Sequence, residues 1–297
     1  MNKKTVFSYL KDYLNNRNSS LSTFEYINPG DYVGYKILKF LVNRKNFITV
    51  FYTIITNFLS LTIQNQYLLI NKNKKKISPK KIILSWGFKE NFDKNGNFKD
   101  KYLNITSNQT SKEYLWIIIY LSKKLPNKIK KNTFIFKQIH KKFSLFNFFL
   151  SIFKIYISSK KNFFLTLKSL NKNSVFAINF WSYINKGINF DKTKKIFIVY
   201  EGQPYQKYFI EKLNNQNLKI YGILHHPPHS LLYNFFKQKC ISPKKLIVSG
   251  SLTKDILVKK YNWEKNNIIL LPSFRNKKKE KIKRRFSYLR IFMTGQK

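Results

Sequence analysis

The sequence predicts an α/β fold, a Rossmann-like parallel sheet with flanking helices that spans residues 76–275. Three observations support this prediction. From residue 195 onward, short apolar runs alternate with helical patterns of about ten residues, which indicates βαβ units. An earlier apolar run, residues 82–87, ends in glycine and is typical of a buried parallel strand. Hydrophobic residues make up 43% of the 297-residue chain and aromatic residues 17%, enough for a sizeable core.

The elements of the second half follow in a regular order. We expect strands at residues 195–200, 218–224, 245–248 and 268–271. We expect helices at residues 203–214, 230–239 and 252–261. Pro204 supports the first of these helices, because proline is favoured in a first helical turn.

The first half of the domain has a less regular pattern. After the strand at residues 82–87 we expect a polar loop over residues 88–108. A helix is expected over residues 113–123, with residues 115–120 as its buried part. The Phe- and Ile-rich stretch 134–165 is broken by lysines, which favours an amphipathic or interfacial helix pair over a membrane span.

Both ends of the chain are set apart from this domain. Residues 1–75 are expected to form a helical segment, because apolar residues recur at helical spacing between Val6 and Leu14. Within it, residues 47–70 are uncharged and long enough to span a bilayer, but their Asn, Ser and Gln content favours a buried helix. Residues 276–297 are expected to be a basic linker and the start of a second domain that is missing or truncated.

The chain carries a formal net charge of +44, from 57 Lys and Arg against 13 Asp and Glu. Lysine supplies most of it, in a chain crowded with other residues of A/T-rich codons, so genome bias explains the excess. Arginine is scarce and no zinc-finger, RNP or helix-turn-helix pattern is present, so no specific nucleic-acid partner is expected. An anionic membrane surface would still attract the chain, by about 1 kcal/mol per lysine close to it.

Two features indicate the compartment. Cys240 is the single cysteine, so no intrachain disulfide can form, which suits a reducing environment. Residues 1–18 are too polar for a signal peptide. We therefore expect a cytoplasmic protein, with peripheral association at the inner face of the plasma membrane as its membrane contact.

Candidate chemistry gathers at two predicted strand ends. Glu201 follows one strand, and His225, His226 and His229 follow the next, in a chain with only 13 acidic residues and 4 histidines. Ligands of open parallel sheets bind outside the carboxyl ends of the strands. A carboxylate beside an imidazole can act as a base with an orienting partner. The structural alternatives are that Glu201 caps the next helix and that the histidines bond to backbone in a proline-stiffened loop.

Other sites have weaker signals. The turn Ser249, Gly250 and Ser251 at a predicted helix N-terminus can hold an anion, although Ser251 is equally a plain N-cap. The acid and histidines do not follow the usual zinc spacings and have no cysteine nearby, so no metal is expected. No GxGxxG, Walker GxxxxGK[ST] or GxSxG motif is present, which disfavours dinucleotide-binding, P-loop and hydrolase functions.

The strand-end segments resemble a known family. Residues 200–205 (YEGQPY) with 220–226 (IYGILHH) are similar to the "E-x-(Q/P)-W … G-x-x-H" pattern of surface-carbohydrate (lipopolysaccharide or capsule) biosynthesis proteins with a GT-B glycosyltransferase-like shape. Residues 243–250, 271–275, 83–86 and 98–102 resemble further short elements of the same family. Tyr205 stands where that family tends to have Trp, and Lys244 where it tends to have Asp.

The resemblance implies a GT-B-like glycosyltransferase, or its N-terminal acceptor-side domain, acting in surface-polysaccharide assembly. The substrates would be a nucleotide-activated sugar and a glycan or glycolipid acceptor, with no further cofactor and no metal. Glu201, His225 and His226 would be catalytic, with Glu201 or His226 deprotonating the acceptor hydroxyl. The substrate-binding residues would be Gln203, His229, Ser249, Gly250, Ser251 and Arg275.

Two alternatives stay open at this point. The chain can be a non-catalytic or truncated carbohydrate-assembly protein that binds anionic lipid or glycolipid through its basic surface. Nucleic-acid binding is the other alternative, and basic charge is its only support.

Overall fold

A computed structural model describes the protein over residues 63–70, 76–110, 113–143, 145–158, 172–214, 217–227, 235–238 and 240–272. The helices predicted before residue 63 lie outside the described residues, as do the predicted linker and second-domain start at 276–297. His229 and Arg275, two of the predicted substrate-binding residues, also lie outside them.

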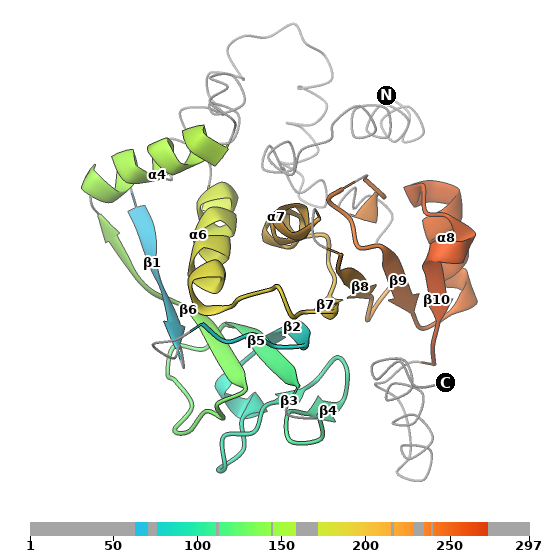
Figure 1. Cartoon of the computed structure of the whole chain (residues 1–297), viewed down its shortest axis with the longest axis horizontal. Coiled ribbons are helices and arrows are strands. Elements are labelled where there is room, and N and C mark those ends of the chain that lie inside the picture. The colour runs from blue at the N-terminus through green and yellow to red at the C-terminus, as the bar shows by residue number, and fades with distance from the viewer. Residues whose placement is uncertain are drawn as a thin grey trace, which may run out of the picture.

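The described residues form one large sheet whose strands lie in the order β1-β6-β5-β2-β7-β8-β9-β10 (Figure 1). The strands are β1 (Ile63–Ile70), β2 (Lys81–Gly87), β5 (Tyr114–Tyr120), β6 (Thr133–Phe143), β7 (Lys195–Val199), β8 (Lys219–Ile223), β9 (Lys245–Val248) and β10 (Ile268–Leu270). Every neighbouring pair is parallel except β1 with β6. The predicted α/β fold with a mostly parallel sheet is therefore confirmed.

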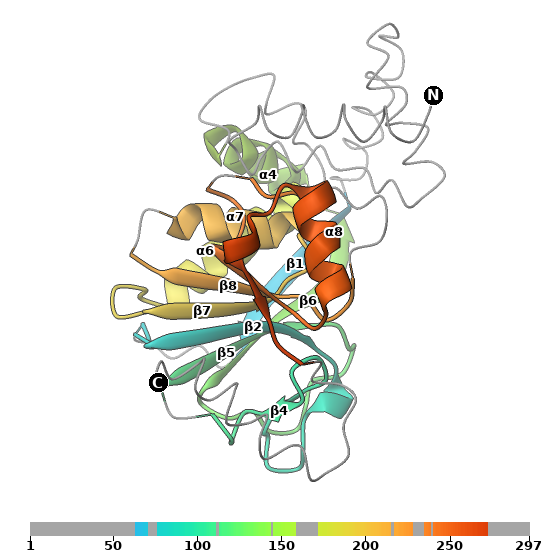
Figure 2. The same ribbon diagram turned by 90° about the vertical axis from the view of Figure 1, so that its right-hand side faces the viewer.

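The order of the strands locates the point where the chain reverses its direction of winding. Counted along the chain, the parallel strands β6, β5 and β2 are the third, second and first, and β7 to β10 are the fourth to seventh. The first six follow the Rossmann order, in which the reversal lies between the first and fourth strands. Here these are β2 and β7, which pair directly and lie side by side in Figure 2.

The α-helices of the described residues share one face of the sheet. They are α4 (Leu145–Ser158), α6 (Lys172–Gly187), α7 (Pro204–Leu213) and α8 (Ser251–Tyr261). Their buried side chains form one core with Ile196 and Ile198 of β7, whose side chains alternate with those of Phe197 and Val199 on the other face. The connections from β6 onward all advance in the same direction, so right-handed crossovers place their helices on the same face.

The opposite face is covered near β2 and β5 by a connection without an α-helix. Between these strands lie the 3-10 helix η2 (Lys89–Asn91) and a short antiparallel pair, β3 (Lys99–Asp100) and β4 (Ile105–Thr106). Figure 1 shows β3 and β4 across the sheet from α4, α6 and α7. Gly87 makes this close packing possible, because a Cβ there would lie 2.6 Å from Cε2 of Phe98.

Several predicted helices prove to be strands. Residues 113–123 were expected to form a helix, but Tyr114–Tyr120 is the central strand β5, buried along its whole length. The spacing of hydrophobic residues does not distinguish a fully buried strand from a buried helix segment. The predicted helix pair over 134–165 is the long strand β6 followed by α4 within the described residues. The predicted buried helix over 47–70 is a strand, β1, in its last eight residues.

Other predictions in the second half hold. The expected strands correspond to β7, β8, β9 and β10, and two expected helices to α7 and α8. The expected helix over 230–239 has no α-helical residue among its described positions, 235–238. Helix α6 was not predicted, although it supplies much of the core. No helix in the described ranges is both long and apolar enough to cross a membrane.

Candidate functional site

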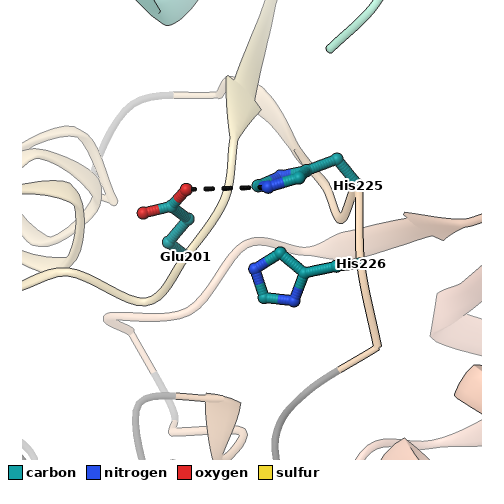
Figure 3. A group of neighbouring side chains, drawn as sticks. All are labelled: Glu201, His225 and His226. Carbon is teal, nitrogen blue, oxygen red and sulfur yellow. Dashed lines mark ion pairs between the residues drawn. The ribbon is translucent and has the colours of Figure 1, made fainter. Parts of the chain in front are cut away.

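The three predicted catalytic residues come together at the winding reversal of the sheet. Glu201 lies just past the end of β7, and His225 and His226 lie just past the end of β8, the parallel neighbour of β7. Glu201 Oε1 is 3.9 Å from His225 Nε2 (Figure 3). The centroids of the two imidazole rings are 4.4 Å apart, and the rings are nearly perpendicular. Parallel strands end at the same edge of a sheet, so residues 24 positions apart in the chain can share one site.

The loop that carries Glu201 is held by a buried amide. Gln206, fully buried in the first turn of α7, accepts hydrogen bonds through Oε1 from the backbone N–H groups of Glu201 (3.0 Å) and Gln203 (3.2 Å). Its Nε2 donates to the carbonyl oxygen of Val199 at 2.7 Å. Gly202 has a φ of +68°, which few other residues adopt at low cost. The backbone of Glu201 is therefore fixed relative to the end of β7.

The structural alternative for Glu201 is that it caps α7, and the structure bears on it directly. The N-cap position of α7 is Gln203, so Glu201 is not the capping residue. Gln203 is also one of the predicted substrate-binding residues, and it stands two positions from Glu201. The carboxylate of Glu201 instead faces the histidines.

Burial raises the pKa of the Glu201 carboxyl group above its ordinary value, while the charge of His226 and a hydrogen bond from Gln203 act in the opposite direction. The side chain of Glu201 keeps 25% of its exposure and that of His225 only 9%. Burial also raises the pKa of the Tyr205 hydroxyl, and the charge of the Glu201 carboxylate raises it further. A half-buried carboxylate that holds a proton more readily than a surface glutamate is suited to proton transfer.

His226 has a defined tautomer. Its Nδ1 lies 2.8 Å from the carbonyl oxygen of Pro227, and because a carbonyl can only accept, Nδ1 is the donor. In the neutral ring the lone pair then belongs to Nε2. This bond is of the kind foreseen in the structural alternative for the histidines, and it coexists with the contacts of His225 and Glu201.

Aromatic side chains complete the site, and the sequence did not single them out as functional. The Tyr102 ring packs on His225 with centroids 4.3 Å apart. Trp86, near the end of β2, meets Tyr205 edge to face at 5.6 Å. The sequence signal that could have indicated Tyr102 is its position in the connection after β2, a strand next to the winding reversal. In the sequence, Tyr102 belongs to residues 98–102, which resemble a short element of the surface-carbohydrate family.

Tyr102 is positioned by a buried carboxylate. Asp100 is completely buried and its Oδ1 accepts hydrogen bonds from the backbone N–H groups of Tyr102 and Leu103, both at 2.7 Å. Its Oδ2 accepts a short hydrogen bond from the Ser85 hydroxyl in β2. Asp100 therefore fastens the turn that bears Tyr102 to the strand beside the site.

The remaining predicted residues lie at the start of α8. Gly250 is its N-cap and Ser251 its first helical residue, so the expected N-cap role of Ser251 is wrong. Ser249 and Ser251 are exposed and Gly250 is half-buried. Gly250 has open space around its Cα, since an added Cβ would meet nothing within 4 Å. This turn follows β9, one strand further along the sheet than β8.

Glu201, His225 and His226 are also the residues of the described chain that can hold a metal ion. Each offers one ligand atom, and these atoms lie within 4.8 Å of one another. Two imidazoles and a carboxylate suit divalent transition metals. Ligands bound to one ion at about 2.1 Å can be at most about 4.2 Å apart, so a metal would require the side chains to draw slightly closer.

A function for this chain rests on its own fold and side chains. Comparisons with protein-family models, with curated proteins and with solved structures gave no match to it.

Proposed function

We propose that the protein is a GT-B-like glycosyltransferase, or the acceptor-side domain of one, in which Glu201 is the catalytic base. The observation that carries this proposal is the Glu201 carboxylate itself, half-buried beside two imidazoles at the winding reversal of the sheet. Open α/β sheets bind their ligands at that position. The resemblance of residues 200–205 and 220–226 to surface-carbohydrate biosynthesis proteins supplies the reaction class.

In the proposed reaction Glu201 accepts the proton of an acceptor hydroxyl as that oxygen attacks the anomeric carbon of the donor sugar. The bond between the sugar and its phosphate breaks, and the nucleotide leaves with the electron pair. The raised pKa of Glu201 makes its carboxylate a stronger base than an ordinary one. His225 and His226 flank the carboxylate and stabilise its charge when protonated.

The substrate contacts follow from the positions of the other residues. Gln203 stands beside Glu201, and Tyr102 provides an aromatic wall against His225. Ser249, Gly250 and Ser251 offer a helix N-terminus for the phosphate groups of a nucleotide-activated sugar. The acceptor is a glycan or glycolipid of the cell surface, met at the inner face of the plasma membrane.

The test replaces Glu201 by Gln in the whole protein and measures nucleotide release from a panel of nucleotide sugars with a membrane-lipid extract as acceptor. We expect turnover to fall by about 100-fold or more, because the general base is lost. The parent enzyme should gain activity with rising pH through a pKa above the ordinary value of 4.5, since Glu201 must be ionised.

The matched control is Glu264→Gln, at an exposed glutamate after α8. It should leave turnover within about twofold of the parent, in line with ordinary surface substitutions. If the Glu201→Gln protein transfers sugar as fast as this control, Glu201 is not the base.

A divalent metal centre is the second candidate, favoured by the ligand set of Glu201, His225 and His226. Equilibrium dialysis against Zn²⁺ and Mn²⁺ separates the two functions. Stoichiometric binding that is lost in both Glu201→Gln and His225→Gln supports a metal centre. Binding that these substitutions leave unchanged excludes these residues as ligands, and turnover that survives chelation supports the acid–base reaction.

A further inference from the structure

Helix α4 carries a continuous apolar face that the described core does not use. Five of the eleven large exposed hydrophobic residues in the described ranges lie on this one helix. They are Phe146 (76% exposed), Phe149 (64%), Leu150 (36%), Phe153 (58%) and Ile157 (53%). Positions 146, 149 or 150, 153 and 157 recur every three or four residues, which places the five side chains on a single stripe of the helix. We call these five residues the α4 stripe.

The other side of α4 fixes how the helix is rotated. Phe148 and Ile155 are buried in the core shared with α6 and α7. Lys154 donates a hydrogen bond from Nζ to Oδ1 of Asn179 in α6 at 3.3 Å. At the end of the helix, the Tyr208 hydroxyl of α7 donates to Oγ of Ser158 at 3.2 Å. The helix is thus held on its inner side, and the exposed α4 stripe belongs to a helix at the edge of the described residues (Figure 1).

Within α4 and next to it in the sequence, all charged residues are basic. The helix contains no acidic residue, and Lys154 is its only charged one. In the sequence, Lys141 and Lys142 precede the helix closely and Lys160 and Lys161 follow it. The chain as a whole carries a net charge of +44. Two copies of such a chain repel each other, whereas an anionic surface attracts them.

We propose that the α4 stripe docks the protein on an anionic lipid bilayer, with its aromatic and aliphatic side chains entering the interface. Helices that lie in a membrane interface combine an apolar face with basic residues in this way. This proposal does not rest on the assigned chemistry of Glu201. The two are compatible in space, because the hydrogen bond from the Tyr208 hydroxyl to Ser158 ties the end of α4 to α7, the helix that starts beside Glu201.

The test measures co-sedimentation of the whole protein with phosphatidylcholine vesicles that contain or lack phosphatidylglycerol. The double variant Phe149→Gln, Phe153→Gln removes apolar side chains from the stripe without changing charge or helix propensity much. We expect the parent to bind the anionic vesicles and the double variant to bind about tenfold more weakly for each Phe lost. Circular dichroism and the thermal midpoint of the variant should match those of the parent.

The control is Leu252→Gln, Leu270→Gln, two exposed leucines away from α4 (69% and 47% exposed). This pair should bind vesicles as the parent does. If the stripe variant binds vesicles as tightly as the parent, charge alone accounts for the binding and the proposal is overturned. A parent protein that fails to bind anionic vesicles would also overturn it. Sedimentation equilibrium tests the competing occupant, since a parent dimer that the stripe variant dissociates would show that a second copy covers the stripe.

Discussion

The two halves of the sheet are built differently and meet at the candidate site. From β7 to β10 the described connections include α7 and α8, whereas β2 and β5 are joined by turns and the short β3–β4 pair. The first kind supplies Glu201 and the two histidines. The second supplies Tyr102, the ring that packs on His225. A regular crossover thus places the reacting groups, and an irregular one shapes the space around them.

Among the described residues, each half also buries one carboxyl or amino side chain, Asp100 or Lys207, and the two have different hydrogen-bond partners. Asp100, in the connection between β2 and β5 that has no α-helix, accepts hydrogen bonds from two backbone N–H groups and a hydroxyl. Lys207 of α7 is 1% exposed and donates from Nζ to the neutral Oε1 of Gln238 at 2.8 Å. A well-bonded buried charge supports a fold, whereas one facing a neutral partner costs free energy.

The largest effect is expected from Asp100→Ala. It leaves the backbone N–H groups of Tyr102 and Leu103 and the Ser85 hydroxyl without their acceptor, and we expect the free energy of unfolding to fall by about 4 kcal/mol. Urea denaturation at pH 7 measures it. Asp93→Ala is the matched control, because Asp93 also accepts from the backbone N–H groups of Asn95 and Asn97 but is exposed, so water replaces it. Equal losses in the two variants would contradict the role of burial.

The contrast between the halves also explains which strands could be predicted from the sequence. The strands β7, β8 and β9 are separated by turns and helices of different polarity, so their boundaries are visible in the sequence. Strand β5 is buried at all seven positions, and its unbroken apolar run lacks the alternation that marks a half-buried strand. The antiparallel edge strand β1 depends on pairing with β6, a long-range contact that no local pattern encodes.

The candidate site divides in the same way. Glu201, His225 and His226 could be predicted because they directly follow strands, and the parallel sheet brings strand ends together. Tyr102 could not, because its place depends on how Asp100 folds the connection back to Ser85. Gln206 was missed for a related reason. It resembles any polar residue of a first helical turn until its amide is seen bonded to the loop before the helix.

A smaller effect is expected from Gln206→Met, which acts on the half with helices. The Met side chain fills a similar volume but cannot bond to the backbone of Glu201, Gln203 and Val199, and we expect a loss of about 2 kcal/mol in the free energy of unfolding. Gln206 is a positioning residue, so kcat should fall more than KM changes. The acidic limb of the pH–rate profile should also move, because Glu201 changes its environment. A stability loss with an unmoved pH profile would leave Gln206 a purely structural role.

The smallest effect is expected from Lys207→Met, and it is a gain in the free energy of unfolding rather than a loss. Burial lowers the pKa of Lys207 to about 7, so between pH 7 and its ordinary value of 10.5 the unfolded chain binds more protons than the folded one. Stability of the parent therefore rises with pH across that window and loses this contribution as pH falls toward 7. Lys207→Met removes the buried amine, and we expect a gain of about 1 kcal/mol at pH 7.

That gain should shrink as the pH rises toward 10.5, because the parent then no longer needs to lose a proton on folding. Urea denaturation at pH 7 and at pH 9.5 measures the difference, with Lys212→Met, at an exposed lysine of the same helix, as the control. A Lys207→Met protein that is less stable than the parent at both values would mean that the bond to Gln238 outweighs the cost of burial. The two halves would then bury their ionisable groups for the same reason, since each would be held by its hydrogen bonds.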